Sequence, residues 1–302
     1  MQREVLDSSI HSTFASCPRK AFYQYVINRA PIGDNYAIGF GVVYHNFRDI
    51  LEVEFQARGS DISQASQCYN IALERATADW TDPPIGHKKE WMNYERLIKT
   101  LEAGFAHWLN EKQQGLVTIL LTEQPFTLEL PSGRQYGGRI DQLFELRGKL
   151  WLRDFKTTSY MGGSFPRRFD PNHQITGYTW ASQKLSNRKV EGVQIEVVYN
   201  TKTKGPEIHT FLSTRSEGHI DQWIASIEQE REDWERNMER TADLGMLAWP
   251  MRTTACDAYG GCYFRDACQK EHPAQVEKWL EFNTIHSVWD FTNPEGEEGI
   301  AD

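Results

Sequence analysis

Two short runs of alternating apolar and polar residues near the middle of the chain place the strongest constraint on its fold. The runs occupy residues 139–146 and 150–156, and only Arg147, Gly148 and Lys149 separate them. A short glycine-containing loop between two alternating runs is typical of a β-hairpin. The sequence therefore predicts an antiparallel strand pair here.

Three ionisable side chains lie on this predicted hairpin. Asp141 is on the first strand, and Asp154 and Lys156 are on the second. Side chains two residues apart on a strand share a face, so Asp154 and Lys156 point the same way, and the hairpin places Asp141 beside Asp154. Two carboxylates with an ammonium nearby can hold a hard cation and act on a phosphodiester. The alternative is a solvated row of charges across two strands.

The surroundings of the two carboxylates favour a cation-binding site over a solvated row of charges. Apolar residues flank them on both strands, where charge is costly unless it is paired or bound to metal. A helix opened by Asp170-Pro171 follows, and it carries Gln174 and Tyr178 on one face because they are four residues apart. Both polar groups suit contact with a phosphate or a nucleotide.

These segments together resemble a known family. GRIDQL, LRDFKTTS and QITGY follow one another in the order G-x-x-D, (D/E)-x-K and Q-x-x-x-Y. This pattern is similar to that of the RecB-type branch of the PD-(D/E)XK nuclease superfamily. The resemblance implies that Asp141, Asp154 and the backbone carbonyl of Phe155 are metal ligands, and that Lys156 positions or activates the attacking water. Gln174 and Tyr178 would then shape the site and touch DNA.

A histidine and a glutamate outside the hairpin are further candidate ligands. The run from Gly39 has helical spacing, and a lone histidine such as His45 on such a helix is ordinarily a surface or core residue. The resemblance implies otherwise, because the G-x-x-x-H motif of this family matches Gly41 and His45, and a nitrogen ligand suits manganese as well as magnesium. Glu123, in the predicted strand pair 116–130, is either an additional ligand or an edge-strand surface residue.

The cysteines suggest a second metal centre. Cys256, Cys262 and Cys268 are evenly spaced near the C-terminus, and Cys17 stands at a predicted helix junction. Four thiolates suffice for a [4Fe–4S] cluster. The resemblance is to AddB-type and CRISPR-adaptation nucleases, in which such cysteines join the two ends of the nuclease fold, although those relatives space the first two C-terminal cysteines more closely. Structural Zn²⁺ is the alternative, and Cys68 is expected to be a spare thiol.

The remaining pattern predicts a mixed α/β fold. The resemblance implies one PD-(D/E)XK nuclease domain over residues 1–292, with a mixed central sheet flanked by helices, a helical insertion at about 61–113 and the C-terminal cysteine segment. Aromatic residues at helical spacing in the insertion are expected to be core rather than a base-stacking platform. Residues 293–302 are acidic and are expected to be a disordered tail.

Composition limits the partners and the compartment. The 302 residues include 39% hydrophobic ones, enough for a sizeable core, and no signal-peptide layout or long apolar run is present. A cytoplasmic protein without membrane contact is therefore expected. The net charge of −9 argues against indiscriminate coating of DNA. It permits a narrow basic channel, and the residues assigned to it are Arg139, Arg153, Lys156, Arg167 and Arg168.

The expected function is a Mg²⁺- or Mn²⁺-dependent DNA exonuclease acting in recombination, repair or processing. The alternatives are an endonuclease of the same fold, a non-catalytic accessory protein that binds DNA ends, and an RNA-directed hydrolase. No Walker motif is present, so any helicase or recombination partner must be another chain.

Overall fold

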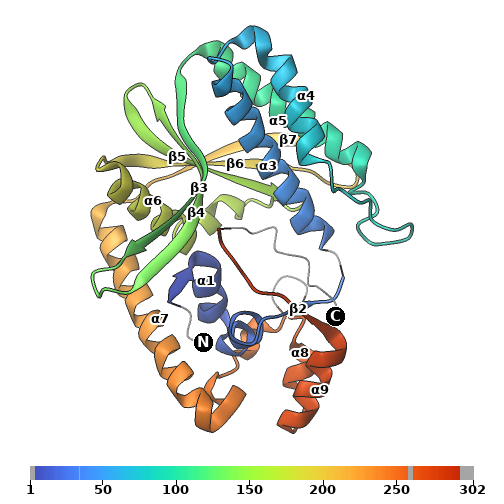
Figure 1. Ribbon diagram of the computed structural model, residues 1–302, viewed down its shortest axis with the longest axis vertical. Coiled ribbons are helices and arrows are strands. Elements are labelled where there is room, and N and C mark those ends of the chain that lie inside the picture. Colours follow the sequence, from blue (N-terminus) through green and yellow to red (C-terminus); the bar gives the residue numbers. More distant parts are fainter. Residues whose placement is uncertain (1–3, 34, 258–260, 293–302) are drawn as a thin grey trace. The chain divides into compact units, whose positions relative to one another are not determined.

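The computed structural model describes residues 4–33, 35–257 and 261–292 (Figure 1). The chain divides into two compact units. The central unit comprises Asp34–Gln124 and Arg139–Ser216, and the terminal unit comprises Met1–Gly33, Pro125–Gly138 and Glu217–Asp302. The single domain expected over residues 1–292 stays a prediction, and the expected tail, 293–302, lies outside the described residues.

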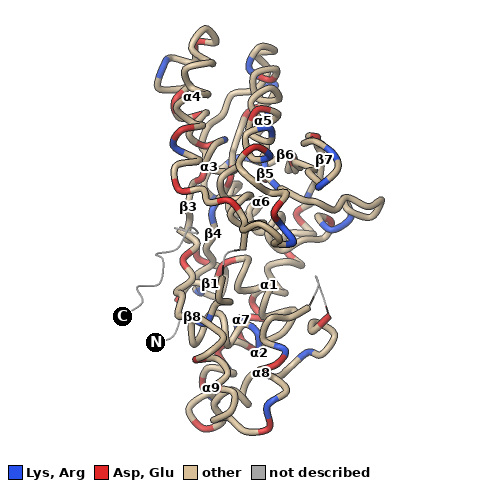
Figure 2. The backbone as a smooth tube through the Cα atoms, turned by 90° about the vertical axis from the view of Figure 1, so that its right-hand side faces the viewer, with Lys and Arg blue, Asp and Glu red and all other residues tan. Residues whose placement is uncertain are grey.

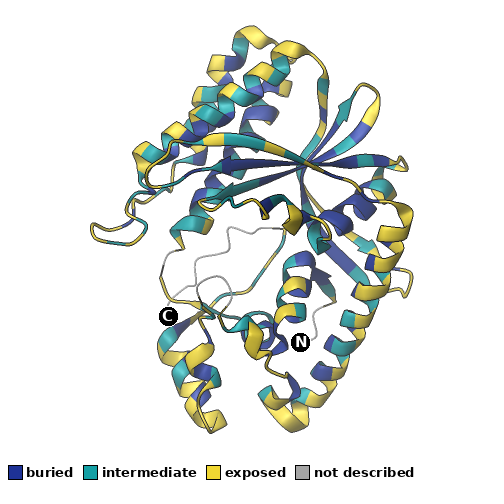
Figure 3. Cartoon of the chain, turned by 180° about the vertical axis from the view of Figure 1, so that it is seen from behind, coloured by how far each residue is buried: buried dark blue, intermediate teal, exposed yellow. Residues whose placement is uncertain are grey.

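A mixed β-sheet forms the middle of the central unit. In this unit it consists of the first part of β3 (Val117–Glu129), the second part of β4 (Gln135–Leu146), and all of β5 (Lys149–Thr158), β6 (Val190–Tyr199) and β7 (Glu207–Ser213). β4 and β5 are antiparallel, with Leu143 opposite Leu152, which confirms the predicted hairpin. β5 is parallel to β6, and β6 is antiparallel to β7. Figure 3 shows that the central strands β4, β5 and β6 are largely buried, whereas β3 and β7 are more exposed.

The hairpin turn consists of only two residues. Arg147 and Gly148 have φ values of 52° and 76°, and Lys149 already belongs to β5. Two consecutive left-handed residues are what a tight hairpin turn requires, because this conformation matches the right-handed twist of the strands. The short turn fixes the register that brings the chemistry of the two strands together.

Helices complete the central unit. They are α3 (Tyr36–Ala57), α4 (Ala65–Ala76), α5 (Tyr94–Gln114) and α6 (His173–Ser186), with short turns at η2 (Ile62–Gln64) and η3 (Phe165–Phe169). α6 forms the crossover that a parallel β5–β6 pair requires. The predicted helical insertion corresponds to α4 and α5, and Trp108 of α5 packs against Phe55 of α3 with ring centroids 5.0 Å apart. Trp108 is 1% exposed, which confirms that it belongs to the core.

Three predicted boundaries were wrong. α3 begins at Tyr36, before the expected Gly39, because the Asn35 side chain accepts a hydrogen bond from the Ile38 amide. α6 begins after Asn172, whose side chain accepts from the Ile175 amide, and not at Asp170-Pro171. Residues 116–130 contain one continuous strand, β3, instead of a strand pair.

The terminal unit is assembled from both ends of the described chain. Its elements are β1 (Val5–Asp7), α1 (Ser8–Ser16), α2 (Pro18–Ala21), the π-helix η1 (Phe22–Val26), β2 (Arg29–Pro31), α7 (Glu217–Leu244), η4 (Gly245–Ala248), η5 (Thr253–Ala255), α8 (Arg265–Cys268), α9 (Pro273–Asn283) and β8 (Thr284–His286). Asp7 caps α1, accepting hydrogen bonds from the Ser9 and Ile10 amides. β1 runs parallel to the beginning of β4, and β2 pairs antiparallel with β8.

Aromatic rings hold the two ends of the chain together within this unit. Trp234 of α7 packs edge-on against Trp249 at 4.9 Å and against Phe14 of α1 at 5.5 Å. Gly137 lies so close to Val5 and Phe291 that a Cβ atom would stand 2.7 and 2.6 Å from their side chains. A glycine is therefore required where β4 begins. Among the described residues, no helix is both long and apolar enough to span a membrane.

Candidate active site and metal centre

The hairpin and α6 bring together the acidic and basic groups that the sequence singled out. Asp154 is 2% exposed, and its Oδ1 lies 2.8 Å from the Lys156 ammonium. Lys156 also donates to the Gln174 side chain of α6 at 3.3 Å. The Asp141 carboxylate accepts the backbone N–H of Phe155 at 2.8 Å. Asp141, Asp154, Lys156 and Gln174 thus surround one point on the sheet.

His45 reaches this site because helix α3 passes close to β5. A Cβ atom on Gly41, one turn before His45, would lie 3.1 Å from the Thr157 hydroxyl, so the small residue permits the close approach. His45 Nε2 lies 2.9 Å from the Phe155 carbonyl oxygen. Its Nδ1 lies 3.3 Å from Glu123 and 3.4 Å from Asp141. The spacing of Gly41 and His45 therefore has a geometric reason.

Glu123 lies inside the site and not on an exposed edge. Its side chain is 9% exposed, and its carboxylate forms a 2.8 Å ion pair with Arg139. The backbone of Glu123 has a φ of 44°, a left-handed conformation that is uncommon for a residue other than glycine and clusters at functional sites. The structure therefore disfavours the surface alternative.

The donor set fits a divalent cation. One ligand atom each from His45, Glu123 and Asp141 lies within 4.8 Å of the others. Asp154 is outside this group of three, but its Oδ2 is buried and has no hydrogen-bond partner among the described residues. Carboxylate oxygens, a nearby backbone carbonyl and one imidazole nitrogen are donors that Mg²⁺ or Mn²⁺ accepts. A buried carboxylate oxygen without a protein partner fits a role as a cation ligand.

The electrostatics of the site also indicate a place for positive charge. Burial raises the pKa values of Asp141 and Asp154. Repulsion from Glu123 further raises the pKa of Asp141, and repulsion from Asp141 further raises that of Asp154. Burial acts to lower the pKa of His45, but the carboxylates of Asp141 and Glu123 outweigh it and raise this pKa to about 9. Burial likewise opposes the charge on Lys156, yet the two aspartates raise its pKa. A bound cation would relieve this concentration of acidic groups.

The side chains of α6 support the site more than they line its surface. Tyr178 is 8% exposed, and its hydroxyl accepts the Arg139 backbone N–H at 3.4 Å. Gln174 holds the Lys156 ammonium, as described above. The two residues share a helix face, as predicted, but the burial of Tyr178 makes direct contact with DNA unfavourable.

Asp49 is a carboxylate that the sequence interpretation missed. Burial, and then the nearby Glu123, raise its pKa to about 6, and the Thr122 hydroxyl donates to it. Asp49 lies four residues after His45 on α3, so the same helical spacing that placed Gln174 and Tyr178 together could have found it.

A buried ionic network behind Phe155 was also missed. Glu196 of β6 and Arg48 of α3 form an ion pair in which both side chains are 0% exposed, and the Tyr44 hydroxyl donates to Glu196 at 2.8 Å. The Arg48 guanidinium lies 4.6 Å from the centre of the Phe155 ring. Burial opposes the charge of Glu196, but Arg48 and Arg153 lower its pKa. This network positions Phe155, whose backbone lies in the candidate metal centre.

The prediction for Arg153 was wrong. Its side chain is 2% exposed, and it is bound by Glu111, Gln142 and Gln194. Adjacent residues of a strand point to opposite faces, so Arg153 faces away from Asp154 and cannot line a channel there. Arg139 faces the site but is engaged with Glu123.

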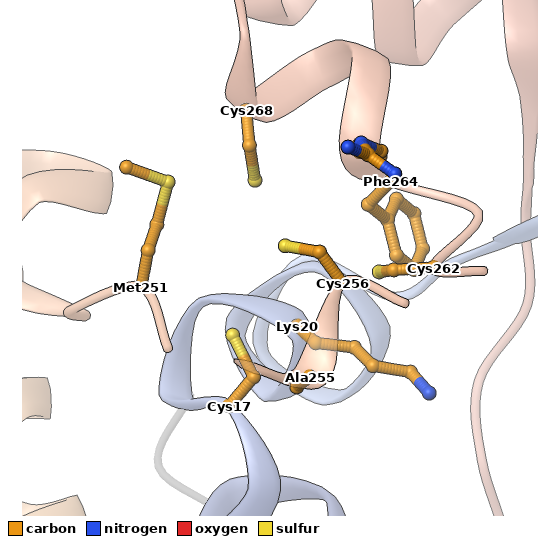
Figure 4. Close-up of a pocket in the computed structure, with 9 residues that line it drawn as sticks. Cys17, Lys20, Met251, Ala255, Cys256, Cys262, Phe264 and Cys268 are labelled. Carbon is orange, nitrogen blue, oxygen red and sulfur yellow. The ribbon is translucent and has the colours of Figure 1, made fainter. Parts of the chain in front are cut away.

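The four cysteines assigned to a second centre line one small pocket of the terminal unit, with a volume of about 20 Å³. Figure 4 shows the sulfur atoms of Cys17, Cys256 and Cys268 directed toward a common space, with Cys262 beside them. The other lining residues are Lys20, Met251, Ala255, Phe264 and Arg265. Sulfur donors with two basic residues and no carboxylate or imidazole fit a thiolate-bound metal group. Cys68 is buried elsewhere, in the core of the central unit.

The fold and the first site together define a class of protein. A mixed sheet flanked by helices, with two buried aspartates and a lysine on one strand pair, is the arrangement of a nuclease core. The family model of the PD-(D/E)XK nuclease superfamily matches residues 8–269, and the chain belongs to this superfamily.

Several solved structures resemble the chain, two of which are described below, whereas a search of curated proteins finds no match. A protein from Eubacterium rectale that is provisionally named an exonuclease is 12% identical, with a TM-score of 0.46 over 77% of this chain and 80% of that one. The protein SSO0001 is 14% identical, with a TM-score of 0.33 over 80% of this chain and 85% of that one. Neither similarity is strong enough to assign an activity.

Proposed function

We propose that the protein is a metal-dependent DNA exonuclease of the RecB type. The observation that carries this proposal is the convergence of His45, Glu123 and Asp141 within 4.8 Å. Beside them stands the pair formed by Asp154 and Lys156. The buried Asp154 Oδ2 has no hydrogen-bond partner among the described residues, which supports its assignment as an oxygen ligand to the cation.

The residues that would hold Mg²⁺ or Mn²⁺ are His45, Glu123, Asp141, Asp154 and the carbonyl of Phe155. When bound, the cation would supply Lewis-acid polarisation of the phosphate and a more acidic water. His45 must give up one proton to act as a ligand. Its Nδ1, which faces Glu123 and Asp141, would bind the cation, while Nε2–H can keep donating to the Phe155 carbonyl. Positive charge in the site favours this loss of a proton.

Lys156 acts on the reacting phosphate in this proposal. Its ammonium is fixed by Asp154 at 2.8 Å and Gln174 at 3.3 Å, and it is 31% exposed. A fixed cation of this kind orients the attacking water and stabilises charge that develops on the phosphate oxygens. Gln174 is a positioning residue, because it acts through Lys156.

A nuclease assay with end-labelled single-stranded, double-stranded and circular DNA tests the proposal. We expect release of short products from linear DNA with Mg²⁺ or Mn²⁺, and none in excess EDTA. Cleavage of closed circular DNA would replace the exonuclease assignment by endonuclease action. Binding of DNA ends without any cleavage would support the accessory-protein alternative, and activity in EDTA would refute the metal assignment.

We also propose that Cys17, Cys256, Cys262 and Cys268 bind a [4Fe–4S] cluster, as the resemblance to AddB-type and CRISPR-adaptation nucleases implies. Their location in one pocket supports this proposal. Anaerobic purification followed by iron, sulfide and zinc analysis tests it. We expect about four iron atoms per chain, whereas one zinc and no iron would establish the structural Zn²⁺ alternative.

The cellular setting follows from the proposed activity. A DNA exonuclease would act in recombination, repair or processing, in the cytoplasm. It would receive DNA from a separate helicase or recombination protein. Co-purification of such an ATPase with the protein from its own cells would test this partnership.

A further inference from the structure

A small pocket with aromatic and basic neighbours lies directly beyond Lys156 in the central unit. Its volume is about 50 Å³, and it is lined by Thr157, Thr158, Ser159, Lys89, Trp91 and Asn200, with apolar side chains beneath. Thr157 to Ser159 follow Lys156 without interruption. Because a strand rises about 3.3 Å per residue, this pocket begins within about 10 Å of the candidate reaction centre.

One lysine lines this pocket and two more follow one of its lining residues in the sequence, although the chain as a whole is acidic. Lys89 lines it, and Lys202 and Lys204 are exposed on the turn that follows Asn200. Arg96 of α5 holds this turn by donating to the carbonyl oxygens of Lys202 and Lys204 at 3.3 and 2.9 Å. Figure 2 shows basic segments at the turn between β6 and β7. Within the described part of the chain, no carboxylate forms an ion pair with Lys89, Lys202 or Lys204.

Nearby acidic residues are engaged elsewhere. Glu95 forms a 2.6 Å ion pair with Lys99. Asp82 accepts hydrogen bonds from the Trp80 ring and the Tyr94 amide, and Glu90 accepts the Gly86 amide. The three lysines therefore keep their positive charge available to an anion in solution.

Two aromatic rings belong to this region, one at the pocket and one that follows it in the sequence. Trp91 is half-buried at the pocket, where it packs against the hydrophobic core, and the Lys89 ammonium lies 5.9 Å from its ring centre. Tyr160, which follows Ser159, is 69% exposed. A pocket of about 50 Å³ is too small to enclose a nucleobase, since one water occupies about 30 Å³ in the liquid. A base can instead lie on an exposed ring while its phosphate contacts a lysine.

We propose that this surface, formed by Trp91, Tyr160, Lys89, Lys202 and Lys204, binds unpaired nucleotides of the DNA strand being cleaved. We name it the strand-binding surface. Aromatic rings combined with cations that follow a phosphate backbone are the means by which proteins bind single strands, since bases in a duplex are already stacked. The inference rests on the proposed nuclease function, and it specifies single-stranded DNA as the substrate.

Equilibrium binding of a fluorescent 12-nucleotide oligothymidylate and of a 12-base-pair duplex, without added Mg²⁺ or Mn²⁺, tests the proposal. We expect Trp91→Ala to weaken single-strand binding by about 5- to 150-fold, the range for loss of one base stack. Trp91→Phe should remain within a few-fold of wild type, because it keeps an aromatic face. Duplex binding should change much less. The matched charge control is Lys149→Ala at the opposite end of β5, which should have no effect.

A triple lysine variant gives an independent readout if Trp91→Ala does not fold. Replacement of Lys89, Lys202 and Lys204 by Ala should reduce the slope of log K against log salt by about 2, since each phosphate contact on a single strand contributes about 0.7. An unchanged slope, or equal losses for single strand and duplex, would overturn the proposal.

The same samples separate this inference from the proposed function. If wild-type protein cleaves DNA with Mn²⁺ but the variants bind single strands as wild type does, only the strand-binding surface is refuted. If the variants lose single-strand binding as expected but no DNA is cleaved, the strand-binding surface stands as a binding site and the nuclease assignment fails.

Discussion

The two candidate metal centres differ in donor chemistry and in how the chain forms them. The central unit offers carboxylates and one imidazole from α3, β3, β4 and β5, whereas the terminal unit offers thiols from α1–α2 and the C-terminal segment. Hard oxygen donors hold exchangeable cations that can act on a substrate. Thiolate donors hold structural zinc and iron–sulfur clusters. Under the proposed function, the central unit carries out the chemistry and the terminal unit is cross-linked by its metal group.

The two centres also differ in what surrounds them. The carboxylate site of the central unit is held in place by a hairpin and by a buried ionic network, so its framework exists before any metal binds. The cysteine pocket joins segments from opposite ends of the sequence and has a cavity of only about 20 Å³. Loss of metal should therefore affect activity in the first case and stability in the second.

The largest expected effect is on the terminal unit. Cys17→Ser should remove the metal group and lower the free energy of unfolding by about 4 to 5 kcal/mol, by analogy with a disulfide that closes a long loop. Iron content and chemical denaturation measure both changes. Cys68→Ala is the control: Cys68 is fully buried, so it should cost about 1 kcal/mol but leave iron unchanged. Equal iron content in both variants would contradict the assignment.

The second largest expected effect is loss of stability when the buried ionic network of the central unit is broken, and it does not depend on bound metal. Glu196→Gln removes the charge that neutralises the buried Arg48 and should destabilise the protein by about 3 to 5 kcal/mol. Glu191→Gln on the same strand changes a partly exposed residue paired with lysines at 3.6 and 3.8 Å, and should cost less than about 1 kcal/mol. Urea denaturation of both variants in EDTA would make the comparison. Similar midpoints would mean that the network does not support the site.

The third effect is on catalysis alone. Lys156→Ala should lower the cleavage rate by about 100- to 1000-fold, as loss of one preorganised donor does, while iron content stays at the wild-type level. Lys149→Ala, at the other end of β5, should cleave normally. Rates under single-turnover conditions with Mn²⁺ are the measurement. A Lys156→Ala variant with the wild-type rate would show that the reaction centre lies elsewhere.

The smallest effect is stabilisation by an exchangeable cation. At a Mn²⁺ concentration about 100 times the dissociation constant, wild-type protein should gain about 2.7 kcal/mol. Glu123→Gln should lose most of this gain, and Glu129→Gln on the exposed side of the same strand should keep it. Thermal unfolding with and without Mn²⁺ measures the gain. If Glu123→Gln responds as wild type does, Glu123 is not a ligand.

Local sequence patterns determined much of the central site. Alternation in 139–146 and 150–156, with a tight turn between them, sets the register that brings the strands bearing Asp141 and Asp154 together. The spacing of Gln174 and Tyr178 places both on one face of α6 because the helix repeats every 3.6 residues. Capping by Asp7 and the break at Cys17-Pro18 were likewise predictable, since they depend on neighbouring residues.

The tertiary structure alone decided which distant side chains meet. Asp49 and Glu123 influence each other through space, although α3 and β3 have no local pattern in common. The burial of Glu196 with Arg48, and the inward orientation of Arg153, follow from which sheet face α3 and α5 cover. Periodicity specifies which face of a helix or strand is buried. It does not specify which other element packs against that face. The partner is selected by burial of apolar area and by the cost of leaving a charge unpaired, and both depend on the whole fold.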